Sequence, residues 1–158
     1  MRVGLISDTH AQMRPEALAA LRGSEHIVHA GDIGSPQVLD ALREIAPLTV
    51  VRGNNDVDPW ADGLTDTAVL QVGEVSIYVL HDVKTLTIDP VIAGHQIVVA
   101  GHSHRPGVVK RNEVLYVNPG SAGPRRFSLP ITIAHLDING GVLNVSIVPL
   151  TIATMQRR

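Results

Sequence analysis

The stretch from Val3 to Asp32 reads VGLISDTHAQMRPEALAALRGSEHIVHAGD and decides the fold class. Val3–Ser7 is a short apolar run that predicts a buried strand. Pro15–Leu21 has apolar residues at helical spacing and a proline in the first turn, which predicts a helix. His26–Ala30 predicts a second buried strand. A strand, a helix and another strand in such a short stretch indicate a parallel sheet.

The same rhythm continues for one more unit and then gives way to strands. Ser35–Leu42 predicts a helix with an N-cap serine and a proline at its first position, and Thr49–Arg52 predicts a third strand. Ala68–Val72 and Val75–Leu80 flank a Gly-Glu pair typical of a hairpin turn. The remaining predicted elements are a short helix at Asp89–Ala93 and strands at Ile97–Ala100, Val108–Lys110, Val114–Asn118, Ile131–Leu136 and Val142–Val148. The last four strands have no helices between them, so we expect them to form a second sheet. The expected fold is an α/β sandwich of two facing sheets with helices outside.

Composition narrows the classes of function. The chain has 158 residues, which is the size of one domain, and we treat residues 1–158 as such. It has no cysteine, which excludes thiolate zinc sites, disulfides and cysteine nucleophiles. The net charge is −2 and no basic stripe is present, so we expect no nucleic-acid partner. No apolar run is long enough for a signal peptide or a membrane span, and we expect a cytoplasmic protein.

Polar residues of the kinds that bind metals recur directly after predicted strands. In an open α/β sheet, this edge is where ligands bind. The residues in question are Asp8, His10, Asp32, Asn54, His81, His102 and His104. So much imidazole suits Mn²⁺, Fe²⁺, Ni²⁺ or Zn²⁺ rather than an all-oxygen site. Seven ligands with one bridging carboxylate predict a two-metal centre of the kind that cleaves phosphate esters.

Glycine precedes three of these candidate ligands, at Gly31, Gly53 and Gly101. Glycine allows the chain to turn sharply out of a strand. We expect each of the three glycines to direct the next side chain toward the ions.

Read in order, the blocks Asp8-Thr9-His10, Gly31-Asp32, Gly53-Asn54-Asn55-Asp56, His81 and Gly101-His102-Ser103-His104 resemble the calcineurin-like metallophosphoesterases. The later block Asn118-Pro119-Gly120-Ser121 is similar to a loop of the small YfcE-type phosphodiesterases. The resemblance implies a four-layer α/β sandwich of two facing mixed sheets flanked by helices. It also implies two divalent ions per chain, with Mn²⁺ favoured and Ni²⁺, Fe²⁺, Zn²⁺ or Mg²⁺ as alternatives.

The resemblance further implies a role for each candidate ligand. Asp8, His10 and His104 hold the first ion, Asn54, His81 and His102 hold the second, and Asp32 bridges them. The implied activity is hydrolysis of a small phosphodiester by in-line attack of a hydroxide that bridges the ions. The catalytic set is Asn55, Asp32 and His102.

Two positions depart from the superfamily pattern. Many members have His and then Glu after the ligand Asn, whereas this chain has Asn55 and Asp56. Asn55 can donate a hydrogen bond to phosphate but cannot supply a proton. Asp82 follows His81 where glycine is frequent, and its carboxylate either orients a ligand or faces solvent.

Substrate contacts are expected from Asn55, Arg105, Arg52 and Ser121. Three of them have an alternative: the two arginines can be solvated surface residues, and Ser121 can belong to a plain turn. Asn54 can likewise be a turn residue. His29 is expected to be a core histidine or to support a ligand.

Three rival functions stay open: a phosphomonoesterase, a DNA nuclease of the same superfamily, and a non-catalytic scaffold such as the retromer subunit built on this fold. The complete ligand set argues against the scaffold, and the short acidic chain argues against the nuclease. A homodimer through the apolar C-terminal strands is a further expectation.

Overall fold

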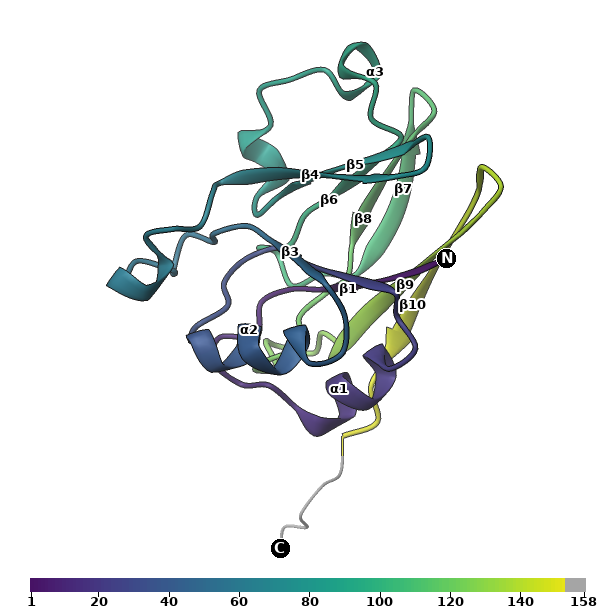
Figure 1. The fold of residues 1–158 in the computed structure, drawn as a ribbon. Coiled ribbons are helices and arrows are strands. Elements are labelled where there is room, and N and C mark those ends of the chain that lie inside the picture. The colour runs from purple at the N-terminus through teal and green to yellow at the C-terminus, as the bar shows by residue number, and fades with distance from the viewer. Residues whose placement is uncertain (153–158) are drawn as a thin grey trace, which may run out of the picture.

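The computed structural model describes residues 1–152, and residues 153–158 lie outside the described part. Two five-stranded sheets face each other (Figure 1). The first sheet has the strand order β10-β9-β1-β2-β3. Its strands are β1 (Arg2–Ile6), β2 (His26–His29), β3 (Leu48–Val50), β9 (Thr132–Asn139) and β10 (Val142–Pro149).

The second sheet has the strand order β4-β5-β6-β8-β7. Its strands are β4 (Thr67–Val72), β5 (Val75–Leu80), β6 (Ile97–Val99), β7 (Gly107–Arg111) and β8 (Val114–Asn118). Both sheets are mixed. β1, β2 and β3 pair in parallel, as do β5, β6 and β8. The antiparallel pairs are β1 with β9, β9 with β10, β4 with β5, and β7 with β8. The predicted sandwich of two facing mixed sheets is confirmed.

One part of the predicted strand grouping is wrong. The last four strands do not form one sheet: β7 and β8 join the second sheet, whereas β9 and β10 extend the first. The reason is the pairing of β9 with β1, in which Val3 lies opposite Leu136 and Leu5 opposite Ala134. These four side chains belong to the single core between the sheets, so β9 buries its apolar face only in that position.

Helices cover the two sheets unequally. α1 (Pro15–Leu21) and α2 (Pro36–Arg43) pack on the outer face of the first sheet, where their apolar sides share a core cluster with Ile6 and Ile27. Both begin with a proline, and Ser35 occupies the N-cap position of α2, although its side chain makes no capping hydrogen bond. The second sheet has only η2 (Val83–Thr85) and α3 (Pro90–Ala93) in the crossover between β5 and β6, so its outer layer is thin.

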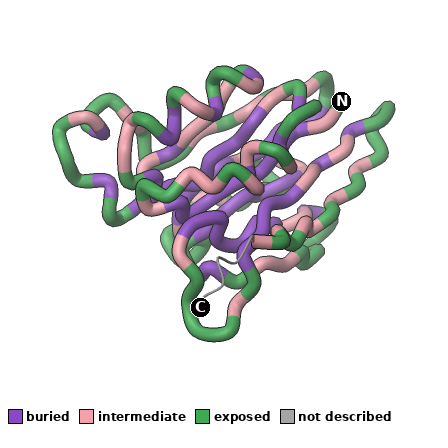
Figure 2. The backbone as a smooth tube through the Cα atoms, turned by 90° about the horizontal axis from the view of Figure 1, so that it is seen from below, coloured by how far each residue is buried: buried purple, intermediate pink, exposed green. Residues whose placement is uncertain are grey.

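The buried part of the chain runs through the strands, and the exposed part lies in the loops and helix surfaces around them (Figure 2). The core between the sheets is built from side chains such as Leu5 and Val28 on one side and Ile77 and Val99 on the other. Their contact fixes how the C-terminal ends of the parallel strands of both sheets meet along one edge.

Candidate metal centre

The candidate ligands follow the C-terminal ends of parallel strands. Asp8 and His10 follow β1, Asp32 follows β2, and Asn54 lies beyond β3, whereas His81 follows β5 and His102 and His104 follow β6. Because the strands of both sheets end at the same edge, the side chains converge. Two groups of ligand atoms each lie within 4.8 Å of one another, namely Asp8 with His10 and His104, and Asp32 with His81 and His102.

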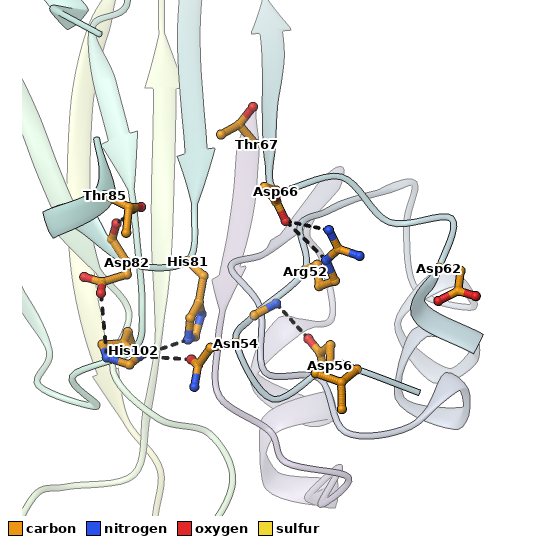
Figure 3. A pocket seen from close by; sticks show the side chains of 12 residues that line it. Arg52, Asn54, Asp56, Asp62, Asp66, Thr67, His81, Asp82, Thr85 and His102 are labelled. Atoms are coloured by element: carbon orange, nitrogen blue, oxygen red, sulfur yellow. Dashed lines mark hydrogen bonds and ion pairs between the residues drawn. The ribbon is translucent and has the colours of Figure 1, made fainter. Parts of the chain in front are cut away.

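Asp32 belongs to the second group and also lies next to the first. Its Oδ2 atom is 3.6 Å from Nε2 of His10 in one group and 3.3 Å from Nε2 of His81 in the other. Asn54 completes the second group, with its Oδ1 atom 3.2 Å from Nδ1 of His102 (Figure 3). All seven side chains named from the sequence therefore lie together in one site.

Unpartnered polar atoms at the centre fit a bound cation. Oδ1 of Asp8 and Nε2 of His10 are buried and have no hydrogen-bond partner in the described structure. The other oxygen of Asp8 accepts hydrogen bonds from the Ser7 hydroxyl at 2.8 Å and from the backbone of His102 at 3.1 Å. Buried polar atoms without partners are rare. Divalent cations with nitrogen and oxygen ligands would satisfy both atoms, so the residues present fit the metals that the sequence suggests.

The hydrogen bond of His81 directs its ring toward the same point. Its Nδ1 atom lies 2.8 Å from the carbonyl oxygen of Ala30, so Nδ1 carries the hydrogen that is donated. The lone pair is then on Nε2, the atom that faces Asp32. A backbone carbonyl in this position is a common partner of a metal-binding histidine.

Backbone strain is concentrated at this edge. Among the described residues, nine that are not glycine have positive φ, and five of these are candidate ligands: Asp8, His10, Asp32, His102 and His104, with φ between 46° and 71°. This left-handed region is uncommon for residues with a Cβ atom. Strained backbone of this kind is typical of functional sites.

The glycines before the ligands do not all act as the sequence suggested. Gly31 has a φ of +103° and makes the expected sharp turn. Gly53 and Gly101 do not have positive φ, so the expectation of a glycine-specific turn is wrong for them. They are needed for space: a Cβ atom on Gly53 would overlap the backbone of Asp32, and one on Gly101 would overlap the hydroxyl of Ser7.

Electrostatics within the site separate its ionisable groups. Burial raises the pKa of Asp8, and the charge of His81 and the Ser7 hydroxyl offset only part of this effect. Burial acts in the same direction on Asp32, but hydrogen bonds from His81 and Asn55 hold the pKa of Asp32 well below its usual range. Burial, together with nearby positive charge, lowers the pKa of His104 to about 4. Asp32 and His104 are therefore deprotonated at neutral pH, as metal ligands must be.

The pKa of His81 moves the other way. Burial alone would lower it, but the hydrogen bond to Asp32 and the charges of Asp32 and Asp8 raise it. A cation that binds here replaces the proton on His81, so binding competes with protonation.

Asp56 supports the site in a way that the sequence did not reveal. Its buried carboxylate accepts hydrogen bonds from the backbone N–H groups of Ile33, Gly34 and Gly53, at 2.9 to 3.1 Å. It thereby ties the loop after β2 to the loop after β3. The only sequence signal was its place two residues after the candidate ligand Asn54. That signal did not show whether Asp56 supports the site or takes part in catalysis.

His29 has a similar supporting role. The sequence left open whether it is a core histidine or supports a ligand, and its contacts correspond to support. Its ring is fully buried in β2, where Nδ1 accepts a hydrogen bond from Gly31 N at 3.0 Å. Nε2 lies 3.0 Å from the hydroxyl of Thr9, which in turn donates to the carbonyl of Ile33. This chain of hydrogen bonds fixes the backbone on both sides of Asp8 and Asp32.

The expected substrate contacts fall in different places. Asn55 lies at the site, but its backbone and side-chain N–H groups donate to the two oxygens of Asp32, at 2.9 and 3.0 Å. Arg52 lines the cleft of about 680 Å³ beside Asn54 and His102, and its guanidinium is held by Asp66 at 3.0 Å. Figure 3 shows Arg52 directed toward Asp66.

Arg105 and Ser121 do not line this cleft. Arg105 is exposed and lines a neighbouring groove instead. Ser121 is buried, and its hydroxyl donates to the carbonyl of Asp8 at 3.1 Å. This geometry gives Ser121 a part in holding the segment of Asp8.

Asp82 lies next to the candidate ligand His102. Its Oδ2 atom is 3.7 Å from Nε2 of His102, on the side of the ring away from Asn54 (Figure 3). Its other oxygen accepts a hydrogen bond from the backbone of Lys84 at the start of η2. Of the two alternatives for Asp82, the contact with His102 corresponds to the one that orients a ligand.

In the part of the chain that the structure describes, no helix has the length and apolar character to span a membrane.

Comparison with known proteins agrees with this geometry. Residues 1–141 match the model of the calcineurin-like phosphoesterase superfamily domain. A probable metallophosphoesterase of Methanothermobacter thermautotrophicus is 32% identical, over 94% of this chain and 92% of that protein.

Two solved structures share the fold. Vps29 of Entamoeba histolytica, crystallised with Zn²⁺, has a TM-score of 0.73 at 24% identity, over 94% of this chain and 99% of that one. YfcE, a phosphoesterase of E. coli, has a TM-score of 0.70 at 21% identity, over 96% of this chain and 100% of that one. The family match spans most of the chain, and the chain therefore belongs to the calcineurin-like phosphoesterase superfamily.

Proposed function

We propose that this protein is a phosphodiesterase that hydrolyses a small phosphodiester with two divalent cations per chain. The observation that carries the proposal is the convergence of seven ligand side chains on one edge, with Asp32 in one group of three and next to the other. In a two-metal site the ions lower the pKa of water and neutralise charge on the phosphoryl group.

The residues of the chain have separate tasks in this proposal. Asp8, His10 and His104 hold one cation, Asn54, His81 and His102 hold the other, and Asp32 binds both. Asn55 positions Asp32 through its two hydrogen bonds, and the second hydrogen on its side-chain nitrogen remains to be donated to a phosphoryl oxygen. Mn²⁺ is the cation that we expect to support the activity best.

Two features favour a diester with a good leaving group. Asn55 stands where many relatives have a histidine, and an amide cannot protonate a departing alkoxide. The cleft also continues into a second groove past His102, which leaves room for an ester arm on either side of the phosphorus atom.

The test uses protein stripped of metal. We would measure hydrolysis of bis(4-nitrophenyl) phosphate and of 4-nitrophenyl phosphate with Mn²⁺, Ni²⁺, Zn²⁺ and Mg²⁺. We expect cleavage of the diester that depends on metal, and a loss of more than about 100-fold in kcat/KM in the Asp32→Ala variant. Asp62→Ala, at the rim of the same cleft, is the matched control and should keep its activity.

Each other outcome has a definite meaning. Cleavage of the monoester alone would keep the two-metal chemistry and make the protein a phosphomonoesterase. If two ions bind per chain and neither ester is cleaved, the proposal fails in favour of a non-catalytic scaffold.

A further inference from the structure

An apolar groove of about 390 Å³ lies beside the metal cleft on the outer face of the second sheet. The floor of the groove is formed by Val98 of β6, by Ala100 directly after β6, and by Tyr116 of β8. Val109 of β7 forms one side. Val83 of η2 lies on the opposite side. Its volume is within the usual range for small-molecule sites.

The groove exists because the outer layer over this sheet is thin. The crossover from β5 to β6 covers Leu80 and Val98 with Leu86, and these residues form a small apolar cluster with Tyr116. No helix among the described residues covers the β8–β7 side, where Val109 pairs with Tyr116 and is 49% exposed. Apolar surface left open next to a catalytic centre is a place for a ligand rather than for solvent.

The rim of the groove is positively charged. Lys84, Arg105 and Arg111 line it, and the guanidinium of Arg111 lies over the ring of Tyr116 at 5.6 Å. None of these three side chains has a carboxylate within salt-bridge distance in residues 1–152. Asp82 is the only acidic residue on the lining, at the end next to the metal cleft. The groove therefore suits an apolar group that carries negative charge.

The groove is continuous with the metal cleft. His102 and Asp82 line both cavities, so a phosphate held at the metal ligands can extend an attached group directly into the groove. The groove runs along β7 from Gly107 to Arg111, a length of roughly 13 Å for a strand of this size. An aryl ring with a charged substituent is shorter than this and fits within the groove.

We propose that this groove binds one ester arm of the substrate, an apolar aryl or alkyl group that bears a second negative charge. The inference rests on the proposed phosphodiesterase function and names the class of its substrate. Cations held by the candidate ligands would bind the phosphate, the apolar floor binds the arm, and the cationic rim binds the second charge.

Binding of phosphonates tests the proposal without turnover, because their C–P bond is not hydrolysed. We would measure the Kd of methylphosphonate, phenylphosphonate and 4-carboxyphenylphosphonate for the Mn²⁺-loaded protein by calorimetry. We expect phenylphosphonate to bind about tenfold more tightly than methylphosphonate, because its ring is buried on the apolar floor. The carboxylate should tighten binding by a further few-fold, roughly what a partly exposed ion pair supplies.

Two variants on one strand separate the groove from the rest of the molecule. Val109→Glu places a negative charge in the groove and should remove about tenfold of the affinity for both aryl phosphonates. Val108→Glu is the matched control, since Val108 is 40% exposed on the opposite face of the same strand and does not line the groove. It should leave all three Kd values unchanged. Arg111→Gln should remove only the gain from the carboxylate.

Equal Kd values for the three phosphonates, or equal losses in the two glutamate variants, would overturn the proposal. These results are independent of the hydrolysis test. Selective binding without turnover would reject the phosphodiesterase function and support the groove as a binding site. Turnover without selective binding would support the phosphodiesterase function and reject the groove as a binding site.

Discussion

A single buried histidine shows how the site is held in place by residues outside the candidate ligand set. His29 makes two hydrogen bonds, one as acceptor from Gly31 N and one with the hydroxyl of Thr9, and the first of them requires a neutral ring. Complete burial lowers the pKa of His29 to about 3, from an ordinary value of 6.5. The folded protein therefore keeps this ring neutral at any pH near physiological.

The pH dependence of stability follows from this shift. Below pH 6.5 the unfolded chain binds a proton at His29 that the folded protein does not, so stability falls as the pH falls from about 6.5 toward 3. Between pH 7.5 and 5.5 we expect His29 to account for a loss of about 1 kcal/mol in the free energy of unfolding of the metal-free protein. Urea unfolding of wild type and His29→Gln at both pH values measures this loss.

Glutamine can replace both hydrogen bonds of His29 but does not titrate. The variant should therefore lose less stability than wild type between the two pH values. His135→Gln is the control, because this ring is partly exposed and, within residues 1–152, bonds only to the carbonyl of Ala20. An identical pH response in wild type and His29→Gln would contradict the prediction.

At the scale of the elements, the site depends on loops that approach each other more closely than side chains allow. The loop after β6 lies against the end of β1 at Gly101, where an added Cβ atom would overlap the hydroxyl of Ser7 and lie 2.6 Å from a carboxylate oxygen of Asp8. The hydrogen bond from the backbone of His102 to Asp8 depends on this approach.

Gly101→Ala should therefore separate the two loops. We expect a loss of about 1–3 kcal/mol in stability, as for overpacking elsewhere, and a decrease of about 10- to 100-fold in Mn²⁺ affinity. Urea unfolding and metal titration measure the two effects. Gly63→Ala is the control, because nothing lies within 4 Å of its added Cβ atom. If Gly101→Ala bound Mn²⁺ as tightly as Gly63→Ala, the close approach would not matter for the site.

At the scale of the whole molecule, the candidate metal centre joins the two sheets. Asp8, His10, Asp32 and Asn54 come from loops of the first sheet, and His81, His102 and His104 come from loops of the second. A cation bound by ligands from both sheets is lost when the sheets separate. Binding energy therefore adds to the stability of the folded protein.

Metal removal should lower the unfolding temperature. At a Mn²⁺ concentration of 100 times its Kd, we expect about 2.7 kcal/mol of stabilisation, or roughly 5–10 °C for a chain of this length. Thermal unfolding of the metal-stripped protein with and without added Mn²⁺ measures the shift. Asp8→Ala should show little of it, while Asp62→Ala should show all of it. No shift in wild type at saturating Mn²⁺ would mean that the seven side chains do not bind the cation.

The sequence by itself determined the local elements and the identity of the candidate ligands. Apolar runs, helical spacing and the Gly-Glu turn predicted most helices and strands, because these depend on neighbours in the chain. The polar residues after the strands were recognisable for the same reason, since each lies within a few residues of a strand end. Only the tertiary structure decided that β9 and β10 belong to the first sheet, because that choice depends on burial against β1, more than a hundred residues away.

The tertiary structure also decided what supports the ligands. Asp56 accepts hydrogen bonds from the backbone of Ile33 and Gly34, His29 bonds to the hydroxyl of Thr9, and Ser7 bonds to the carbonyl of Gly31. Each of these partners lies 20 or more residues away along the chain, and no sequence pattern marks them. Gly53 and Gly101 looked like turn glycines, yet their role is set by atoms of Asp32, Ser7 and Asp8 from other strands. The groove beside His102 is likewise a tertiary feature, since it exists only where the helical layer over the second sheet is missing. Contacts between residues near in sequence were predictable, and contacts made by packing separate strands were not.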